Sequence, residues 1–240
     1  MSEHDVAKHT KEIVNVIKAP GSWRHKLGDV ALEIGIIVFA ITLSLLVERW
    51  REKEKERQVE HSFLVNLKKD LLTDQKQLKE DSITYTTMLK QFKYMRKVNQ
   101  GQALPKDSAA WALNGLYNQV WFNASNSRYE ALKASGKLDI IEDEQLQLDI
   151  VNLYQQTIPT LLSSTTLFDE WKTKVADYTD QRLIYNKQTN NIESLLRERV
   201  YANWLIRDGL IMEILERYRA VAVMNRRIVG EINKYLAEKE

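Results

Sequence analysis

Side chains suited to catalysis or metal binding are scarce in this sequence and form no known site. The four histidines are His4, His9, His25 and His61. His4 and His9 are five residues apart, which misses the i, i+4 spacing of a helical metal pair. Cysteine is absent, the eight glycines are dispersed, and no GxSxG motif occurs, so thiol chemistry, zinc ribbons, phosphate loops and serine triads are not expected. We therefore expect a protein that is not an enzyme, with no catalytic residue, metal or cofactor.

One tract carries groups that could contact a ligand or a partner. Arg128, Tyr129 and Lys133 supply two cations and a phenol, and Gly136 follows them. A glycine at this position predicts a left-handed C-terminal helix cap with free backbone groups beside those side chains. The alternative is a structural helix break with a packed tyrosine, because capping alone explains Gly136. The tract is a candidate partner contact, and the sequence leaves both interpretations open.

The stretch from Val30 to Val47 is apolar apart from one charged residue, Glu33. A helix over these eighteen residues would be about 27 Å long, close to the hydrocarbon core of a bilayer. Aromatic and cationic residues typical of a membrane interface flank it: Trp23, Arg24, Lys26, Arg49, Trp50 and Arg51. The pattern predicts a transmembrane helix over residues 28–50. A buried core helix and a cleaved signal peptide are the alternatives, which the apolar character on all sides and the charged sequence after Val47 disfavour.

Small residues and Glu33 define two faces of this predicted helix. At 100° per residue, Ala31 and Gly35 share one face, and Glu33, Ala40 and Ser44 share the opposite one. Small residues four apart let helix backbones approach closely in lipid, which favours homo-oligomerisation; the alternative is a single helix whose small residues face lipid. A glutamate about one turn inside the interface either faces a partner or reaches the headgroups and flanking cations.

Composition predicts an all-α fold on both sides of the span. The chain has only 8 Gly and 3 Pro, whereas Leu, Ile, Lys, Glu and Gln are abundant. Residues 1–27 are predicted to be a basic amphipathic leader, which lies either at the headgroup level or against the main domain. Residues 51–240 are predicted to be one helical bundle domain. No Gly or Pro occurs between Val47 and Gly101, so the span should continue into a long helix of that bundle.

The long helix carries an apolar seam with a seven-residue repeat. The repeat comprises Leu64, Leu71, Leu78, Tyr85 and Phe92. Leu67, Met88 and Met95 add a second heptad position, which Asp74 and Asp81 interrupt. Because the second position is incomplete, the seam is interpreted as the core face of a bundle in preference to a long free coiled coil.

Turn and cap signals divide the remaining sequence. They predict a loop at 99–108, a helix from Ser127 that Gly136 stops, a helix from about Glu142 that Pro159 kinks or ends, and two last helices at 192–206 and 208–239. No convincing internal repeat accompanies them.

Two stretches form a recognisable pattern. Residues 28–53 place Gly28, Glu33, Gly35 and Trp50 in an order of Gly and Glu, apolar run, then Trp and a charged helix. The second stretch has the spacing Tyr-x-x-Leu-x-x-Ser-Gly-x-Leu, formed by Tyr129, Leu132, Ser135, Gly136 and Leu138. Both resemble a family of uncharacterised bacterial single-span membrane proteins, classed as domains of unknown function. The resemblance implies a membrane-anchored helical domain and supplies no mechanism.

Together these features predict a membrane-anchored helical interaction or signalling protein without catalytic activity that self-associates. The alternative is an oligomeric channel or membrane-disrupting effector whose pore is lined by Glu33, Ala40 and Ser44. The net charge of +2, with both signs interspersed, predicts no nucleic-acid partner; the expected partners are the lipid bilayer, further copies of the chain and an unknown protein. We expect a single-pass protein of a bacterial inner membrane, and the short leader favours a cytoplasmic N-terminus, although cations flank both ends of the span.

Overall fold

The structure is a computed structural model that describes residues 23–103, 105, 108–184 and 190–239, with side chains described from Ala31 onward. Within that part the chain is helical and contains no β-strand, so the all-α prediction is confirmed. The helices are α2 (Trp23–Asn99), α3 (Ser108–Tyr117), α4 (Ser127–Ala134), α5 (Glu144–Asn152), α6 (Ile158–Asp180), α7 (Ile192–Leu196), α8 (Arg199–Leu205) and α9 (Gly209–Lys239). Three short turns complete the order: η1 (Leu138–Ile140), η2 (Leu153–Thr157) and η3 (Ile206–Asp208).

The chain divides into two units, Met1–Gln58 and Val59–Glu240, and helix α2 contributes to both. Residues 1–22 of the predicted leader lie outside the described residues, as do the side chains of residues 23–30. The predicted division into leader, span and bundle therefore stays a prediction.

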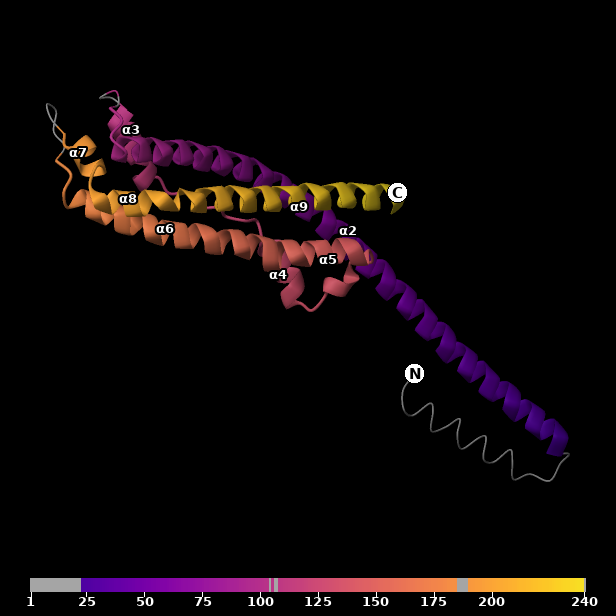
Figure 1. The fold of residues 1–240 in the computed structure, drawn as a ribbon. Coiled ribbons are helices and arrows are strands. Elements are labelled where there is room, and N and C mark those ends of the chain that lie inside the picture. Colours follow the sequence, from indigo (N-terminus) through magenta and orange to yellow (C-terminus); the bar gives the residue numbers. More distant parts are fainter. Residues whose placement is uncertain (1–22, 104, 106–107, 185–189, 240) are drawn as a thin grey trace. The chain divides into compact units, whose positions relative to one another are not determined.

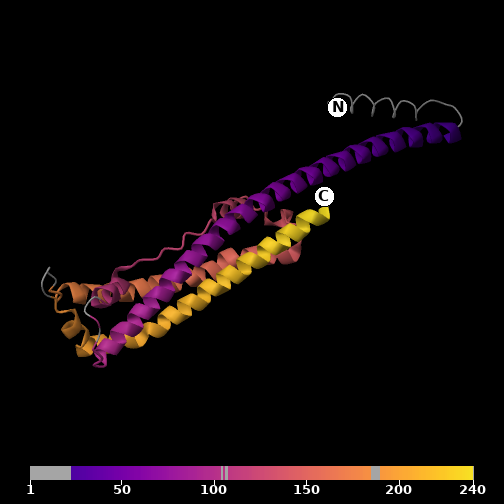
Figure 2. The ribbon, with the colours of Figure 1, turned by 90° about the horizontal axis from the view of Figure 1, so that it is seen from above.

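The second unit is a bundle built from three long helical segments. Residues 59–99 of α2, the α5–α6 segment and α9 run side by side (Figures 1 and 2). The heptad residues of α2 form the centre of this bundle, because Leu64, Leu71, Tyr85 and Phe92 are all buried. Tyr85 packs against α6 and α9, with ring centroids 6.2 Å from Phe168 and 5.4 Å from Tyr218. The interpretation of the seam as a bundle-core face is confirmed.

The predicted helix breaks are correct at Asn99, Ser108 and Gly136. Helix α2 ends at Asn99 and α3 begins at Ser108. Gly136 has φ of 68°, the left-handed conformation that glycine adopts at least cost. The next helix, α5, begins at Glu144, where the Asp143 carboxylate accepts hydrogen bonds from the Gln145 and Leu146 amides.

Pro159 neither ends the helix nor leaves it regular. The π-helical turn η2 precedes it, and α6 then continues with the proline in its first turn. A proline in the first turn of a helix needs no amide donor, and the wider turn before it changes the phase of the backbone hydrogen bonds. The helical segment thus continues from α5 through the π-turn η2 into α6, and this turn accommodates the proline.

The prediction of a single helix at 192–206 is wrong. The structure has α7, a break at Arg197 and Glu198, then α8 and η3. Two long-range contacts stabilise the break: the Asn99 side-chain amide donates to the carbonyls of Leu196 and Glu198, at 2.9 and 3.2 Å. The Tyr178 hydroxyl also donates to the Glu198 carboxylate at 2.6 Å. Partners distant in sequence therefore replace the helical hydrogen bonds at this point.

Candidate functional site

The side chains of the apolar segment of α2, residues 31–47, are exposed apart from that of Glu33. The side chains of Phe39 and Trp50 are 69% and 68% exposed, and none of the most apolar window is buried inside the structure. In the described part of the chain, α2 is the one helix that is long and apolar enough to cross a membrane. The segment thus has the surface that a lipid solvent favours and water does not.

The structure leaves the predicted faces of this segment open. Ala31, Gly35, Ala40 and Ser44 are exposed, and Glu33 is half-buried. A Cβ added to Gly35 would meet nothing within 4 Å, so the position has room for a close neighbour. Of the predicted interface residues, Arg49, Trp50 and Arg51 are exposed. The side chains of Trp23, Arg24 and Lys26 lie outside the described residues.

The tract around Tyr129 is organised by packing. Tyr129 is fully buried, stacks on Tyr154 with centroids 4.6 Å apart, and accepts a 2.7 Å hydrogen bond from the Gln155 amide. Arg128 forms an ion pair with Asp70 at 2.8 Å, and the Lys133 ammonium lies 5.9 Å from the Tyr129 ring centroid. The tyrosine is thus a core residue, whereas the charged ends of Arg128 and Lys133 remain at the surface beside Gly136.

An extended segment, residues 118–126, connects α3 to α4 along the bundle (Figure 1), and we refer to it as the strap. Its apolar side chains Val120 and Phe122 are buried, and the Phe122 ring lies 6.3 Å from that of Tyr218 on α9. Trp121 between them points outward and is 71% exposed. The alternation is that of a β-strand, but the partners of the strap are helices.

Side chains from α2 hold one end of the strap by its backbone. The Asp74 carboxylate, buried in the seam of α2, accepts hydrogen bonds from the Ser125 amide at 3.1 Å and the Ser125 hydroxyl at 2.7 Å. The Gln77 amide donates to the Trp121 carbonyl at 2.7 Å. Since an extended segment without a neighbouring strand leaves its backbone groups unpaired, these side chains supply the missing partners.

At the other end of the strap, the buried ammonium of Lys172 on α6 donates to the Asn118 carbonyl. Lys172 also pairs with Asp169 at 3.2 Å. Burial lowers the pKa of Lys172, an effect that Asp169 opposes, and burial raises the pKa of Asp74, an effect that the hydrogen bonds from Ser125 oppose. Both charged groups are therefore retained in the core as partners of the strap backbone.

A second polar cluster lies between α2 and α9. The Tyr218 hydroxyl donates to the Asp81 carboxylate at 3.3 Å, and Tyr85 packs beside them. Burial raises the pKa of Asp81, Tyr85 and Tyr218, so both phenols are protonated at neutral pH. The cluster contains no histidine, cysteine or serine that a base could activate, and no group of three metal-binding side chains occurs among the described residues.

The buried carboxylate of Glu60 holds the C-terminal end of α9. It accepts hydrogen bonds from the Tyr235 hydroxyl at 2.7 Å and the Glu142 amide at 2.8 Å. The Lys239 ammonium lies 3.9 Å from it and pairs with Glu142 at 2.5 Å. Burial, with the nearby Glu60 carboxylate, raises the pKa of Tyr235 to about 12. Three elements thus meet on one carboxylate two residues after the boundary between the two units.

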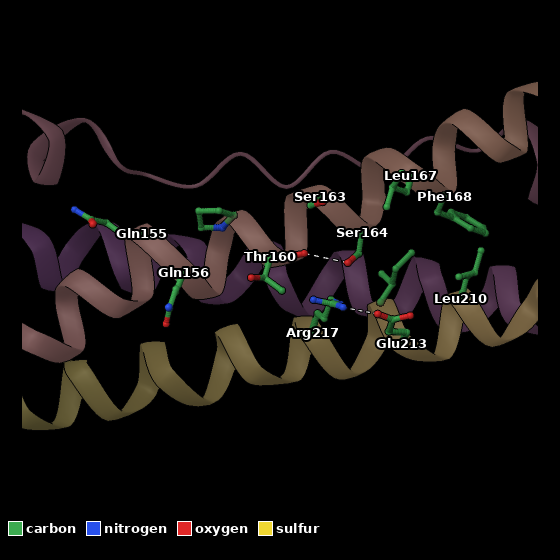
Figure 3. Close-up of a pocket in the computed structure, with 12 residues that line it drawn as sticks. Gln155, Gln156, Thr160, Ser163, Ser164, Leu167, Phe168, Leu210, Glu213 and Arg217 are labelled. Carbon is green, nitrogen blue, oxygen red and sulfur yellow. Dashed lines mark hydrogen bonds and ion pairs between the residues drawn. The ribbon is translucent and has the colours of Figure 1, made fainter.

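Two grooves between helices of the bundle are lined entirely by described residues. The groove between α6 and α9 has a volume of about 410 Å³ (Figure 3). Its lining combines amides, hydroxyls and the Glu213–Arg217 ion pair with apolar side chains such as Leu167 and Leu210. Thr160 and Ser164 face it from α6, where the Ser164 hydroxyl donates to the Thr160 carbonyl at 3.0 Å. The groove between α2 and α9, which we call the α2–α9 groove, is larger, at about 630 Å³, and combines apolar residues with cations.

A family model, the family of unknown function DUF6090, matches residues 33–197. The chain belongs to this family. Comparison with curated proteins and with solved structures gave no match. The resemblance to a family of unknown function is therefore confirmed. The DUF6090 match covers the apolar segment from Glu33, the strap and the tract around Tyr129, and it ends before α8 and α9.

The sequence did not predict the strap or its holders in this DUF6090 protein. Asp74 and Asp81 were recognised only as interruptions of the seam, although a charged residue at a core position indicates a buried polar partner. Lys172 and Glu60 gave no comparable signal, because each is one of many charges on a polar-rich helix. Their partners are 54 and 82 residues away in the sequence, at Asn118 and Glu142.

Proposed function

We propose that this DUF6090 protein is a membrane-anchored helical protein that acts by interaction or signalling, without catalysis, and self-associates. One observation carries the proposal: the apolar segment 31–47 is exposed on all sides. Soluble proteins rarely expose contiguous apolar patches larger than roughly 600 Å². A single membrane span removes this surface from water and leaves the bundle at the bilayer surface.

The polar groups of the bundle core support a non-catalytic role. Asp74 and Lys172 hold the strap, Asp81 accepts from Tyr218, and Glu60 joins α9 to the start of the bundle. Each of these ionisable groups is thus accounted for by a structural contact, and none of the four lines either groove.

Self-association is supported by the small residues of the span. Ala31 and Gly35, and Ala40 and Ser44, are exposed pairs four residues apart, the spacing that allows helix backbones to approach in lipid. We place the protein in a bacterial inner membrane as a single-pass protein with a cytoplasmic N-terminus. Reporter fusions after Glu240, active on only one side of the membrane, test this orientation.

The oligomeric channel is the second candidate, because Glu33 shares a face with Ala40 and Ser44 and a ring of such faces would form a polar lining. Liposomes containing the full-length protein separate the two functions. The interaction protein causes no ion flux above that of empty liposomes. Flux that is abolished by Ala40→Leu and retained in Ile41→Leu would identify a pore instead.

The anchor and self-association are tested on the same full-length protein. We expect it to stay in the membrane pellet after alkaline carbonate extraction. Chemical cross-linking in that membrane should yield dimers or larger species that Gly35→Leu reduces at least about threefold and Ile36→Leu leaves unchanged, because only the small residue allows close approach. Recovery in the soluble fraction would refute the anchor, and equal cross-linking in both variants would refute this helix face.

A further inference from the structure

The α2–α9 groove is polarised along its length. Gln75 on α2 donates to Asn225 on α9 at 3.0 Å, and Tyr218 donates to Asp81, so the two helices run antiparallel. Ile83 and Met212, which are 58% and 49% exposed, therefore lie together at one end of the groove. The other end is lined by cations.

The cationic end is not neutralised within the bundle. Lys79 on α2 and Arg226 on α9 line the groove, are exposed and form no ion pair with a described residue. Arg219, which also lines the groove from α9, pairs with Glu216 at 3.1 Å on the same helix. The groove thus has two uncompensated positive charges at one end and exposed methyl groups at the other.

The dimensions and chemistry of the groove fit a helix. Residues 75–86 of α2 line its full length, which corresponds to about 18 Å, or three helical turns. Because the groove lies between two neighbouring helices of a three-helix bundle, a further helix could pack there as in a four-helix bundle. Helix-in-groove recognition uses apolar side chains at positions i, i+3 or i+4 and i+7.

We propose that the α2–α9 groove is a docking site for an amphipathic helix of a partner protein, with acidic residues at the end that meets Lys79 and Arg226. The inference rests on the proposed interaction function, whose partner surface it names. Residues 5–18 of this chain carry Lys8, Lys11 and Lys18 and lack the required charge. Lys79 and Arg226 line the groove from two different helices. Two separated cations match carboxylates on successive turns of a bound helix better than one lipid headgroup.

The test is a titration of the detergent-solubilised full-length protein with two synthetic eighteen-residue peptides. Both peptides share one leucine stripe; one carries glutamates in its last two turns and the other carries lysines at the same positions. We expect the acidic peptide to bind and the basic peptide to bind at least about tenfold more weakly, a difference of about 1.4 kcal/mol. The acidic peptide gains two charge pairs with Lys79 and Arg226, whereas the basic peptide meets two like charges.

Charge reversal in the groove provides the decisive comparison. In Lys79→Glu/Arg226→Glu the preference of the protein should invert, so that the lysine peptide binds better than the glutamate peptide. The matched control is Lys69→Glu/Lys234→Glu, which reverses two exposed charges on the same helices outside the groove and should leave the preference unchanged. Helical circular dichroism confirms that each variant is folded.

Three outcomes would overturn the docking site. They are no binding of either peptide, equal binding of both, and a preference that does not invert in the groove variant. Binding of dodecyl phosphate that depends on Lys79 and Arg226, with neither peptide bound, would identify an anionic lipid site and also overturn it. The titration is done in detergent, so its failure is distinct from a failure of membrane anchoring.

Discussion

Helix α2 contains two regions with the same backbone geometry and opposite surfaces. Residues 31–47 are apolar on every side and exposed, whereas residues 59–99 alternate between a buried seam and a polar face. The first region has no preferred direction for its apolar side chains, which suits a solvent that is apolar all around. The second has a single apolar stripe, which suits burial against two other helices. Helix propensity is common to both regions, and the distribution of apolar residues around the helix axis decides which environment each region suits.

The largest expected effect is on the free energy of unfolding, which should depend on leucines in the seam and not on leucines in the apolar region. Leu67→Ala, in the buried seam, should lower the free energy of unfolding of the bundle by about 2–5 kcal/mol, because a cavity is left in the core. Leu43→Ala, in the exposed region, should leave it unchanged. Urea unfolding of the full-length protein in detergent, followed by tryptophan fluorescence, measures both. Equal losses in the two variants would contradict the distinction.

An arginine substitution should impair membrane insertion in the apolar region of α2 and have no such effect in the bundle. Val38→Arg places a cation at the centre of the apolar region, at a cost of about 2.5–3.5 kcal/mol for membrane insertion. We expect most of this variant to be lost from carbonate-washed membranes. Ile83→Arg, at an exposed position of the bundle, is the matched control and should be recovered like the unmodified protein. Retention of Val38→Arg at the control level would show that residues 31–47 do not insert.

Asp74 interrupts the apolar seam, and its substitution tests whether this carboxylate holds the strap. Asp74→Ala should reduce stability by about 1–3 kcal/mol, because the Ser125 amide and hydroxyl lose their buried acceptor. Limited proteolysis should then cleave the strap faster. The control is Asp70→Ala, which removes a partly exposed ion pair with Arg128 and should cost less than about 1 kcal/mol. A strap equally protected in both variants would show that Asp74 does not hold it.

Two glycines, Gly35 in the apolar region of α2 and Gly136 after α4, test backbone requirements. Gly136→Ala should destabilise the bundle by about 1–2 kcal/mol, because Gly136 has φ of 68° and alanine is strained there. Gly35→Ala in the exposed helix should leave bundle unfolding unchanged. Thermal unfolding followed by circular dichroism compares them. A neutral Gly136→Ala would mean that the cap can form without a left-handed residue.

The smallest expected effect is a pH dependence of the bundle. Burial raises the pKa of Asp74 above its ordinary value of 3.8, so the folded state binds a proton that the unfolded state releases. The free energy of unfolding should therefore increase as pH falls through the raised pKa, and the gain is complete below about 3.8. Urea midpoints of the unmodified protein and Asp74→Asn between pH 7 and pH 4 isolate this contribution. A difference that grows with rising pH would reverse the assigned sign.

Features that depend on local or periodic sequence patterns could be predicted from the sequence. The seam of α2, the Gly136 cap and the exposed apolar helix follow from spacing and composition within one helix. The apolar helix and the tract that contains Gly136 also carry the resemblance to DUF6090. The predicted self-association, orientation and partner contacts concern other molecules and stay predictions.

The remaining features depend on contacts between distant residues. The strap has no helical period, and its backbone partners come from Asp74, Gln77 and Lys172, which belong to two different helices. The break after Leu196 is stabilised by Asn99 from the end of α2. Tyr129 was a candidate surface contact, but its stacking on Tyr154 makes it part of the core. Tertiary contacts override local preference at each of these sites.

The absence of cysteine allows a direct comparison of the apolar region of α2 with the charged residues that follow it. Single substitutions Val38→Cys and Lys53→Cys, in full-length protein within intact membranes, are treated with a water-soluble maleimide. We predict that Lys53→Cys reacts rapidly from one side, whereas Val38→Cys reacts only after detergent or denaturant is added. Comparable labelling of both positions in untreated membranes would show that residues 31–47 are not embedded in lipid.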